Sequence, residues 1–177
     1  WWAANGDARD AVHGHDIERM QGMAFGTGQV SQAFALDGGN DHGRVPQHND
    51  LDIGASAAGL TIELWVNPSR TQFAPLLQWN AFAGAEGVGL WQQNNGNTGV
   101  NAALTDTSGT GHDIGVNADV LPRNAWTHVA VTYDKATGFG RIYINGVLTT
   151  EQAMGIFTPR TNLPMVFGAR IADSGGT

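Results

Sequence analysis

The amino-acid sequence predicts an all-β fold, a two-sheet antiparallel jelly-roll sandwich. In residues 60–66, Leu60, Ile62, Leu64 and Val66 alternate with Thr, Glu and Trp, which is the period-two pattern of a strand. Clusters of Gly, Asn, Asp and Ser separate such stretches, and no segment shows the apolar stripe of a long helix. About ten short strands with turns between them are typical of two packed sheets.

The first half of the chain supplies strands of increasing regularity. Residues 1–32 are irregular and rich in Gly, Asp and His. Residues 32–38 are expected to form a strand, because Phe34 and Leu36 alternate with small residues before an Asp-Gly turn. A short strand at 43–46 ends at a proline. After the strand at 60–66, residues 76–79 and 88–92 are expected to pair across a Gly- and Ala-rich loop.

The second half contains the clearest hairpins. Strands at 100–104 and 112–116 are separated by the turn cluster Asp-Thr-Ser-Gly-Thr-Gly. The strand at 126–133 turns back into 141–145. Asn145 and Gly146 then predict a two-residue type I′ turn, because both positions of that turn need positive φ. Residues 147–150 return, and 165–169 form a last apolar strand.

Composition excludes several classes of protein. A chain of 177 residues is one domain by length, residues 1–177, with net charge −7 and nine scattered Lys and Arg residues. A basic stripe for nucleic acid is missing, so that partner is not expected. The absence of cysteine excludes disulfides, thiolate metal sites and a cysteine nucleophile. No apolar run approaches a membrane span, so membrane insertion is not expected either.

Four motifs in order carry a family resemblance. They are Phe-Ala-Leu-Asp-Gly-Gly-Asn-Asp-His-Gly-Arg-Val (34–45), Leu-Thr-Ile-Glu-Leu-Trp-Val-Asn-Pro (60–68), Trp-Thr-His-Val-Ala-Val-Thr-Tyr-Asp (126–134) and Arg-Ile-Tyr-Ile-Asn-Gly (141–146). Together they resemble the laminin-G-like, concanavalin-A-like jelly-roll domains of secreted bacterial proteins. The resemblance implies an extracellular or cell-surface location. It leaves function open, because this fold hosts lectins, adhesion modules, calcium-binding modules and glycosidases.

The ends of the chain differ from the family pattern. Members usually finish with a strand carrying an Ile-Asp-Glu-Val-type run, and this chain stops at Thr177 before one. We therefore allow for a jelly roll that lacks its last strand. The chain starts at Trp1-Trp2 without a Met or a basic region, so we interpret it as a segment of a larger modular protein. Nothing suggests an obligate oligomer, and a monomer within a larger chain is expected.

A calcium site is expected at the turn that follows the first strand. The candidate ligands are Asp37, Asn40 and Asp41, with Asp7 and Asp10 approaching from the N-terminal segment. Carboxylate and amide oxygens suit Ca²⁺, and the resemblance implies a structural calcium near this turn. The alternative is that these side chains only bond their own backbone and shape the turn.

A carbohydrate site is expected where tryptophans and amides gather. Flat aromatic faces pack against the C–H surfaces of sugars, and amides bond their hydroxyl groups. The candidate residues are Trp79, Asn80, Trp91, Gln92, Asn94 and Asn95. Trp79 stands at a strand end where the family is usually polar, which favours function. Packing in the sandwich is the favoured reading for Trp91.

The other tryptophans and the histidines receive structural roles. Trp65 and Trp126 belong to the family pattern and are assigned to packing. His13 and His15, with Asp10 and Asp16 nearby, could imitate a transition-metal site, but a solvated loop is the favoured interpretation.

Catalytic patterns are missing. Jelly-roll glucanases carry Glu-x-Asp-x-x-Glu on one strand, and none of Glu18, Glu63, Glu86 and Glu151 has that spacing. We therefore expect a non-catalytic carbohydrate-binding module of a secreted protein, with a glycan as partner and calcium as a structural ion. Two alternatives stay open. One is an adhesion module with a broad exposed apolar patch. The other is an enzyme, or an accessory part of a glycoside hydrolase or lyase, and Glu63 paired with an aspartate within about 5–10 Å across an open cleft would indicate a glycosidase.

Overall fold

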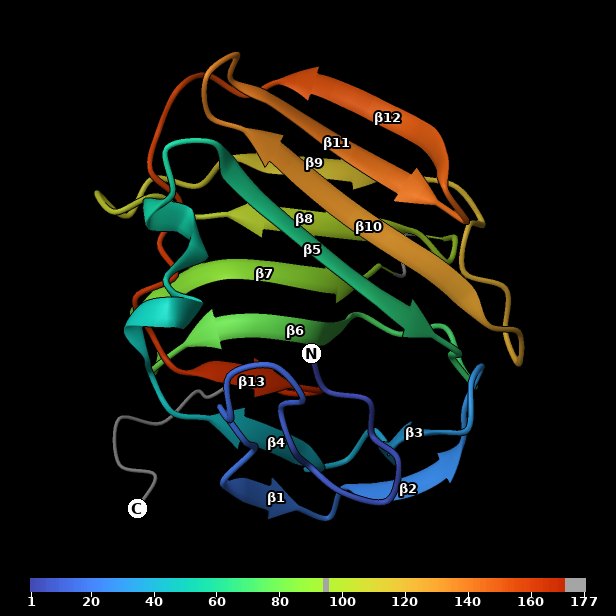
Figure 1. Ribbon diagram of the computed structural model, residues 1–177. Helices are drawn as coiled ribbons and strands as arrows, with labels where there is room; N and C mark the ends of the chain where they lie inside the picture. Colours follow the sequence, from blue (N-terminus) through green and yellow to red (C-terminus); the bar gives the residue numbers. More distant parts are fainter. Residues whose placement is uncertain (94–95, 171–177) are drawn as a thin grey trace.

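Two antiparallel sheets and a small ribbon make up the fold. The computed structural model describes residues 1–93 and 96–170 (Figure 1). The larger sheet has the order β1-β4-β13-β6-β7-β8-β9. Its strands are β1 (Arg19–Gln21), β4 (His42–Val45), β13 (Met165–Phe167), β6 (Ala74–Asn80), β7 (Glu86–Gln92), β8 (Val100–Leu104) and β9 (Asp113–Val116).

The smaller sheet has the order β12-β11-β10-β5. Its strands are β12 (Val147–Ala153), β11 (Phe139–Ile144), β10 (Thr127–Asp134) and β5 (Gly59–Val66). A ribbon of β2 (Ala24–Thr27) and β3 (Gln32–Ala35) stands apart. Two 3₁₀ helices, η1 (Asn49–Leu51) and η2 (Ile53–Ala55), connect β4 to β5. Within the described residues, no helix has the length and apolarity needed to cross a membrane.

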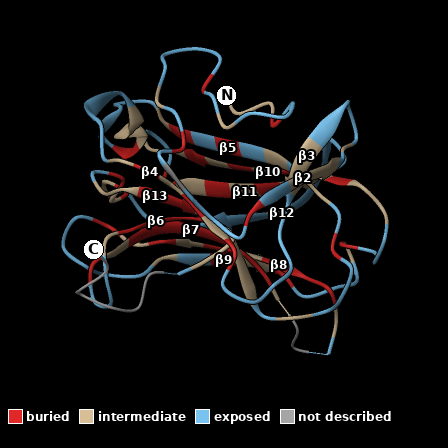
Figure 2. Cartoon of the chain, turned by 90° about the horizontal axis from the view of Figure 1, so that it is seen from below, coloured by how far each residue is buried: buried red, intermediate tan, exposed pale blue. Residues whose placement is uncertain are grey.

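The hydrophobic core lies between the two sheets. In Figure 1 the four-stranded sheet crosses in front of the seven-stranded one. Inward-facing residues of β7, β8 and β9 meet those of β10 and β11, with Leu90, Val100, Ile114, Val129 and Ile142 at most 1% exposed. Figure 2 shows this buried layer in red, whereas β12 is mostly exposed and the β2–β3 ribbon alternates between exposed and intermediate residues. The two layers are those of a jelly-roll sandwich, as the sequence predicts.

The N-terminal segment covers the part of the larger sheet that lies beyond the smaller one. Trp2 packs edge-on against Phe167 of β13, with ring centroids 5.4 Å apart. Ile17 and Met23 are buried in the same core cluster as Val45 of β4. Asp10 holds the segment in shape, because its carboxylate accepts hydrogen bonds from the backbone N–H groups of residues 12, 13 and 15.

Most expected strands are confirmed, with boundary shifts of a few residues. The strand pair predicted at 76–79 and 88–92 is β6 and β7. The type I′ turn is also confirmed, with φ of 51° at Asn145 and 79° at Gly146. Strands β1 and β2 lie within the N-terminal region that sequence patterns describe as irregular, since three- and four-residue strands are too short to show alternation.

One packing assignment is wrong. Trp65 is 42% exposed on the outer face of the smaller sheet, where it lies against His128 with ring centroids 5.2 Å apart. The reason is the alternation along β5. Ile62 points into the core, so Glu63 and Trp65 point outward.

The Tyr133 hydroxyl ties the chain after β12 to the core. Tyr133 is 1% exposed, donates a hydrogen bond to the Gly155 carbonyl at 2.9 Å and accepts one from the Phe157 N–H at 2.9 Å. We predict that Tyr133→Phe lowers the free energy of unfolding by about 0.5–1.5 kcal/mol, because it removes the hydrogen bonds that the hydroxyl makes to the backbone of residues 155 and 157. Tyr143→Phe is the control, since the Tyr143 hydroxyl has no hydrogen bond among the described residues. Equal denaturant midpoints for both variants would contradict the prediction.

Candidate functional site

The outer face of the seven-stranded sheet carries a shallow hollow. Strand register aligns Gln78 of β6, Gly89 of β7, Ala103 of β8 and Asp113 of β9 in one row across this face. The adjacent row contains Pro75, Trp91, Asn101 and Gly115 in the same strand order. The hollow has a volume of about 180 Å³ and is open to solvent along one side.

Small residues form the floor of the hollow. A Cβ atom at Gly89 would lie 2.7 Å from Nε1 of Trp91 and 3.2 Å from Cγ of Gln78. At Gly115 it would lie 3.0 Å from Oδ1 of Asn101. Neither glycine needs a positive φ, so their lack of a side chain serves space rather than backbone conformation. These glycines leave room over the sheet for larger side chains of the same strand, Trp91, and of neighbouring strands, Gln78 and Asn101.

A stacked aromatic pair forms one wall. The rings of Phe73 and Trp91 lie 5.0 Å apart between centroids and are inclined by only 16°. Trp91 is 9% exposed and Phe73 is 61% exposed. Phe73 therefore presents a flat apolar surface that is supported from behind by the indole, for which Gly89 leaves space.

Amides and carboxylates supply the polar groups. Gln78 is 4% exposed, lines the hollow, and its Oε1 atom has no hydrogen-bond partner among the described residues. A buried acceptor without a partner costs about 1–3 kcal/mol, so this oxygen is suited to accept a bond from a ligand hydroxyl. Asn101 and Asp113 line the same hollow. At its other end Glu86 forms an ion pair with Arg170.

The β8–β9 turn is held together by one carboxylate beside the hollow. Asp106 accepts hydrogen bonds through Oδ1 from the Ser108 hydroxyl at 2.6 Å and the Thr110 N–H at 3.0 Å. Its Oδ2 lies 3.1 Å from Nε2 of His112. The Ser108 hydroxyl and then His112 lower the pKa of Asp106 well below the usual carboxylic range. The turn is therefore organised around a charged group at neutral pH.

Comparison with known families assigns the chain to a superfamily. A sequence model of the concanavalin A-like lectin/glucanases superfamily matches residues 37–177. The chain belongs to this superfamily. No curated protein matches the sequence.

Solved structures share this concanavalin A-like fold at low identity. Domain 4 of an extracellular arabinanase from Geobacillus stearothermophilus, in complex with arabinotriose, is 20% identical with a TM-score of 0.65, and the match covers 96% of this chain and 82% of that one. The binding domain of botulinum neurotoxin serotype G is 16% identical with a TM-score of 0.68. That match covers 89% of this chain but 39% of the toxin chain.

A third similar structure is the ligand-binding domain of botulinum neurotoxin serotype D in complex with N-acetylneuraminic acid. It is 16% identical with a TM-score of 0.65, and the match covers 93% of this chain and 43% of the toxin chain. The present chain thus spans about two fifths of the neurotoxin chains. At these identities the similarity establishes the concanavalin A-like fold.

Two of the predicted carbohydrate residues lie in the interior of the concanavalin A-like sandwich. Trp79 is 3% exposed within the core cluster, and its Nε1 donates a hydrogen bond to the Leu51 carbonyl at 3.2 Å. Asn80 is fully buried and donates to the Phe82 carbonyl. This burial contradicts the expectation that Trp79 offers its face to a sugar. A position at which the family is usually polar can therefore be buried in this chain.

The remaining predicted carbohydrate residues divide between the faces of β7. Trp91 lies at the hollow, although packing was the favoured interpretation for it. Gln92 is 3% exposed and donates a hydrogen bond to the Arg70 carbonyl at 3.0 Å, so it does not reach the hollow. Adjacent residues of a strand point to opposite sides of a sheet, which separates Gln92 from Trp91. Asn94 and Asn95 lie outside the described residues.

The predicted calcium ligands make the bonds of a turn. Asp37 Oδ1 accepts from the Gly39 N–H at 2.7 Å, and Asp41 Oδ2 accepts from the Asp37 N–H at 2.7 Å. The Arg70 guanidinium donates to the Asp37 carbonyl, which places a positive charge at the turn. Asn40 is exposed at the same turn. These contacts fit the alternative interpretation, in which the side chains shape the turn.

Asp7 and Asp10 are also engaged locally. Asp7 Oδ1 accepts from the Arg9 N–H at 3.2 Å, and both oxygens of Asp10 accept bonds within the N-terminal segment. Among residues 1–93 and 96–170, neither aspartate joins a group of three metal-ligating side chains with Asp37 and Asp41. Calcium itself stays a prediction.

Sequence patterns miss most of the hollow. Phe73 stands in an irregular segment before β6, and Gln78, Asn101 and Asp113 lie on three different strands. Alternation along each strand places them on the side opposite to Leu77, Ala102 and Ile114. Their meeting depends on strand order and register, which local patterns do not contain.

The charge of Asp106 generates a pH prediction. The pKa of Asp106 is lower in the folded chain than its ordinary value near 3.8. The ionised carboxylate therefore makes its full contribution to the free energy of unfolding above about pH 4. This contribution is lost as the pH falls from about 4 towards the pKa of Asp106 in the folded chain. We predict that Asp106→Asn lowers Tm at pH 7 and that the difference from the wild type narrows near pH 3. A difference in Tm that is independent of pH would contradict this assignment.

Proposed function

We propose that this protein is a non-catalytic module that binds a neutral glycan on the outer face of its seven-stranded sheet. The observation that carries the proposal is the hollow, in which a supported aromatic surface, Phe73 on Trp91, stands beside the unpaired carbonyl oxygen of Gln78. A pyranose or furanose ring offers an apolar C–H face and a rim of hydroxyl groups. The first suits the phenyl ring, and the second suits Gln78, Asn101 and Asp113.

The charge of the site favours neutral sugars. Glu86 and Asp113 line the hollow, and the one cationic side chain among its lining residues, Arg170, forms an ion pair with Glu86. The chain also carries a net charge of −7. Uronate and sialate chains would meet electrostatic repulsion here, so we expect neutral polysaccharides such as arabinan to bind better.

The distribution of carboxylates supports a binding role. Glu63 lies on the outer face of the four-stranded sheet, with its Oε2 at 3.6 Å from Nε2 of His128. It is therefore remote from the hollow, which lies on the other sheet. Glu86 is engaged in an ion pair with Arg170 at the end of the hollow. Similarity to a domain of an extracellular arabinanase supports a place in an exported protein that acts on polysaccharides.

An adhesion module remains the second candidate. Several large apolar side chains are exposed on the smaller sheet, among them Trp65 of β5 and Val147 and Leu148 of β12. They lie on the two edge strands of the smaller sheet rather than around the hollow. A partner protein at these residues would leave glycan affinity unaffected, so the experiment below separates the two functions.

We predict that Phe73→Ala lowers affinity for the glycan about tenfold, or about 1.4 kcal/mol, because the stacking surface is removed. Phe73 is 61% exposed, so the change spares the core. Trp65→Ala is the matched control, since Trp65 is an exposed aromatic residue on the opposite sheet. Affinity electrophoresis against neutral and anionic polysaccharides measures the effect.

Retardation by a neutral glycan that is lost in Phe73→Ala and kept in Trp65→Ala supports the proposal. Retardation that is kept in Phe73→Ala and lost in Trp65→Ala would indicate that the glycan binds to the smaller sheet. Retardation by anionic polysaccharides alone would overturn the preference for neutral sugars. If the wild type unfolds cooperatively and no glycan retards it, the carbohydrate function is wrong.

Calcium enters as a separate proposal. If a structural Ca²⁺ binds at the Asp37–Asp41 turn, millimolar Ca²⁺ raises Tm relative to a chelator, and Mg²⁺ at equal ionic strength does not. Asp41→Asn then loses the rise, because one carboxylate ligand is neutralised. A Tm that is identical with calcium and with chelator would leave the turn explained by its hydrogen bonds alone.

A further inference from the structure

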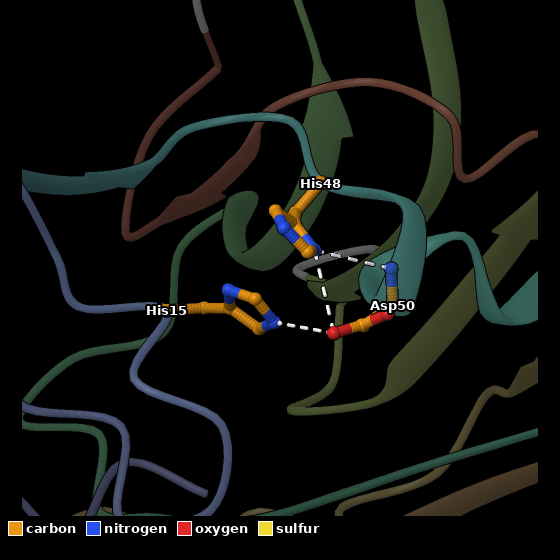
Figure 3. Close-up of side chains that lie close together, drawn as sticks. All are labelled: His15, His48 and Asp50. Carbon is orange, nitrogen blue, oxygen red and sulfur yellow. Dashed lines mark hydrogen bonds and ion pairs between the residues drawn. The ribbon is translucent and has the colours of Figure 1, made fainter.

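Two histidines and an aspartate from distant parts of the chain converge at one point. His15 belongs to the N-terminal segment, whereas His48 and Asp50 stand at the start of η1. Nε2 of His15 lies 3.2 Å from Oδ2 of Asp50, and Nδ1 of His48 lies 3.5 Å from the same oxygen. Figure 3 shows both imidazoles directed at the carboxylate. We refer to these three residues as the His15 cluster.

The N-terminal segment holds His15 in place from its backbone. The His15 N–H donates to Oδ2 of Asp10 at 3.2 Å, and its carbonyl accepts from Nε1 of Trp2 at 2.9 Å. The His15 side chain is only 11% exposed, and its ring lies against that of His48 with centroids 4.0 Å apart and the ring planes inclined by 36°. The solvated loop expected from Gly14 is therefore wrong for His15, because contacts distant in sequence fix it.

The η1 helix holds the other two members. His48 is the N-cap of η1, and its Nδ1 accepts a hydrogen bond from the Asp50 N–H at 3.2 Å. An accepting nitrogen is unprotonated and carries a lone pair directed towards Asp50. A metal ion at this nitrogen would take the place of that hydrogen bond.

The spacing of the three atoms fits a small coordination sphere. One ligand atom from each residue lies within 4.8 Å of the other two. A tetrahedral ion with bonds of about 2.0–2.1 Å has ligand atoms about 3.3–3.4 Å apart. The distances from the two imidazole nitrogens to the Asp50 oxygen, 3.2 and 3.5 Å, bracket that value.

The donor set selects the type of ion. Imidazole nitrogens suit Zn²⁺, Cu²⁺ and Ni²⁺, whereas Ca²⁺ and Mg²⁺ take oxygen ligands. Among the described residues, this is the one group of three His, Asp or Glu side chains close enough to share an ion. We propose that His15, His48 and Asp50 bind a divalent transition metal ion, which joins the N-terminal segment to η1.

Titration calorimetry of the full, tag-free chain with Zn²⁺ tests the proposal. We expect one high-affinity site per chain, and His15→Gln, His48→Gln and Asp50→Asn should each weaken it by at least about tenfold. His128→Gln is the matched control, because His128 lies near a single carboxylate, Glu63, at 3.6 Å. It should leave the affinity unchanged.

A second measurement separates binding from a folding defect. Zn²⁺ should raise Tm of the wild type and of His128→Gln, and it should not raise Tm of His15→Gln. A variant that melts cooperatively without metal but shows no shift supports the site. Equal Zn²⁺ affinity in the wild type and in all three cluster variants would overturn the proposal, as would several weak sites with no high-affinity one. Neither result depends on glycan binding, so this inference and the proposed function fail or succeed separately.

Discussion

The burial of the inner face of the seven-stranded sheet is the constraint on which the rest of the structure depends. Strands β4, β13, β6, β7, β8 and β9 of that sheet contribute buried apolar residues to the core, and apolar area exposed to water costs roughly 25 cal/mol per Å². The four-stranded sheet covers the inner faces of β7, β8 and β9. The part formed by β1, β4 and β13 needs a second cover. The N-terminal segment provides it, with Trp2 against Phe167 and Ile17 beside Val45.

This second cover explains how an irregular segment becomes part of the fold. Residues 1–17 contain no helix or regular strand, so their backbone groups need partners from elsewhere. Asp10 supplies acceptors for several of them, and Trp2 bonds the His15 carbonyl. Holding the segment on the sheet also brings His15 to His48. The His15 cluster is thus a consequence of core burial rather than of local sequence.

The outer face of the seven-stranded sheet carries small residues where the inner face carries apolar ones. Its central positions are Gly89, Ala103 and Gly115, which leave room above the backbone, while the inner positions beside them are large and apolar. A sheet that only needed solubility could carry charged side chains there. Instead the glycines allow Trp91 to lie flat beneath Phe73 and leave Gln78 facing an open space. Because of this asymmetry, the outer face carries an open hollow at these positions instead of a layer of charged side chains.

The sequence by itself determined the all-β class, most strand positions and the Asn145-Gly146 turn, because these depend on period-two alternation and on local φ preferences. It also identified Trp91 as a candidate residue for carbohydrate. It misplaced Trp79 and Trp65, since alternation states which residues share a face but not which face is buried. Only the tertiary structure decided that Trp79 lies in the core. It also brought four side chains around one hollow, those of Phe73, Gln78, Asn101 and Asp113. In the same way it placed His15 beside His48 and Asp50. Those contacts arise from strand order and from the cover over the larger sheet, and both join residues that are far apart in the chain.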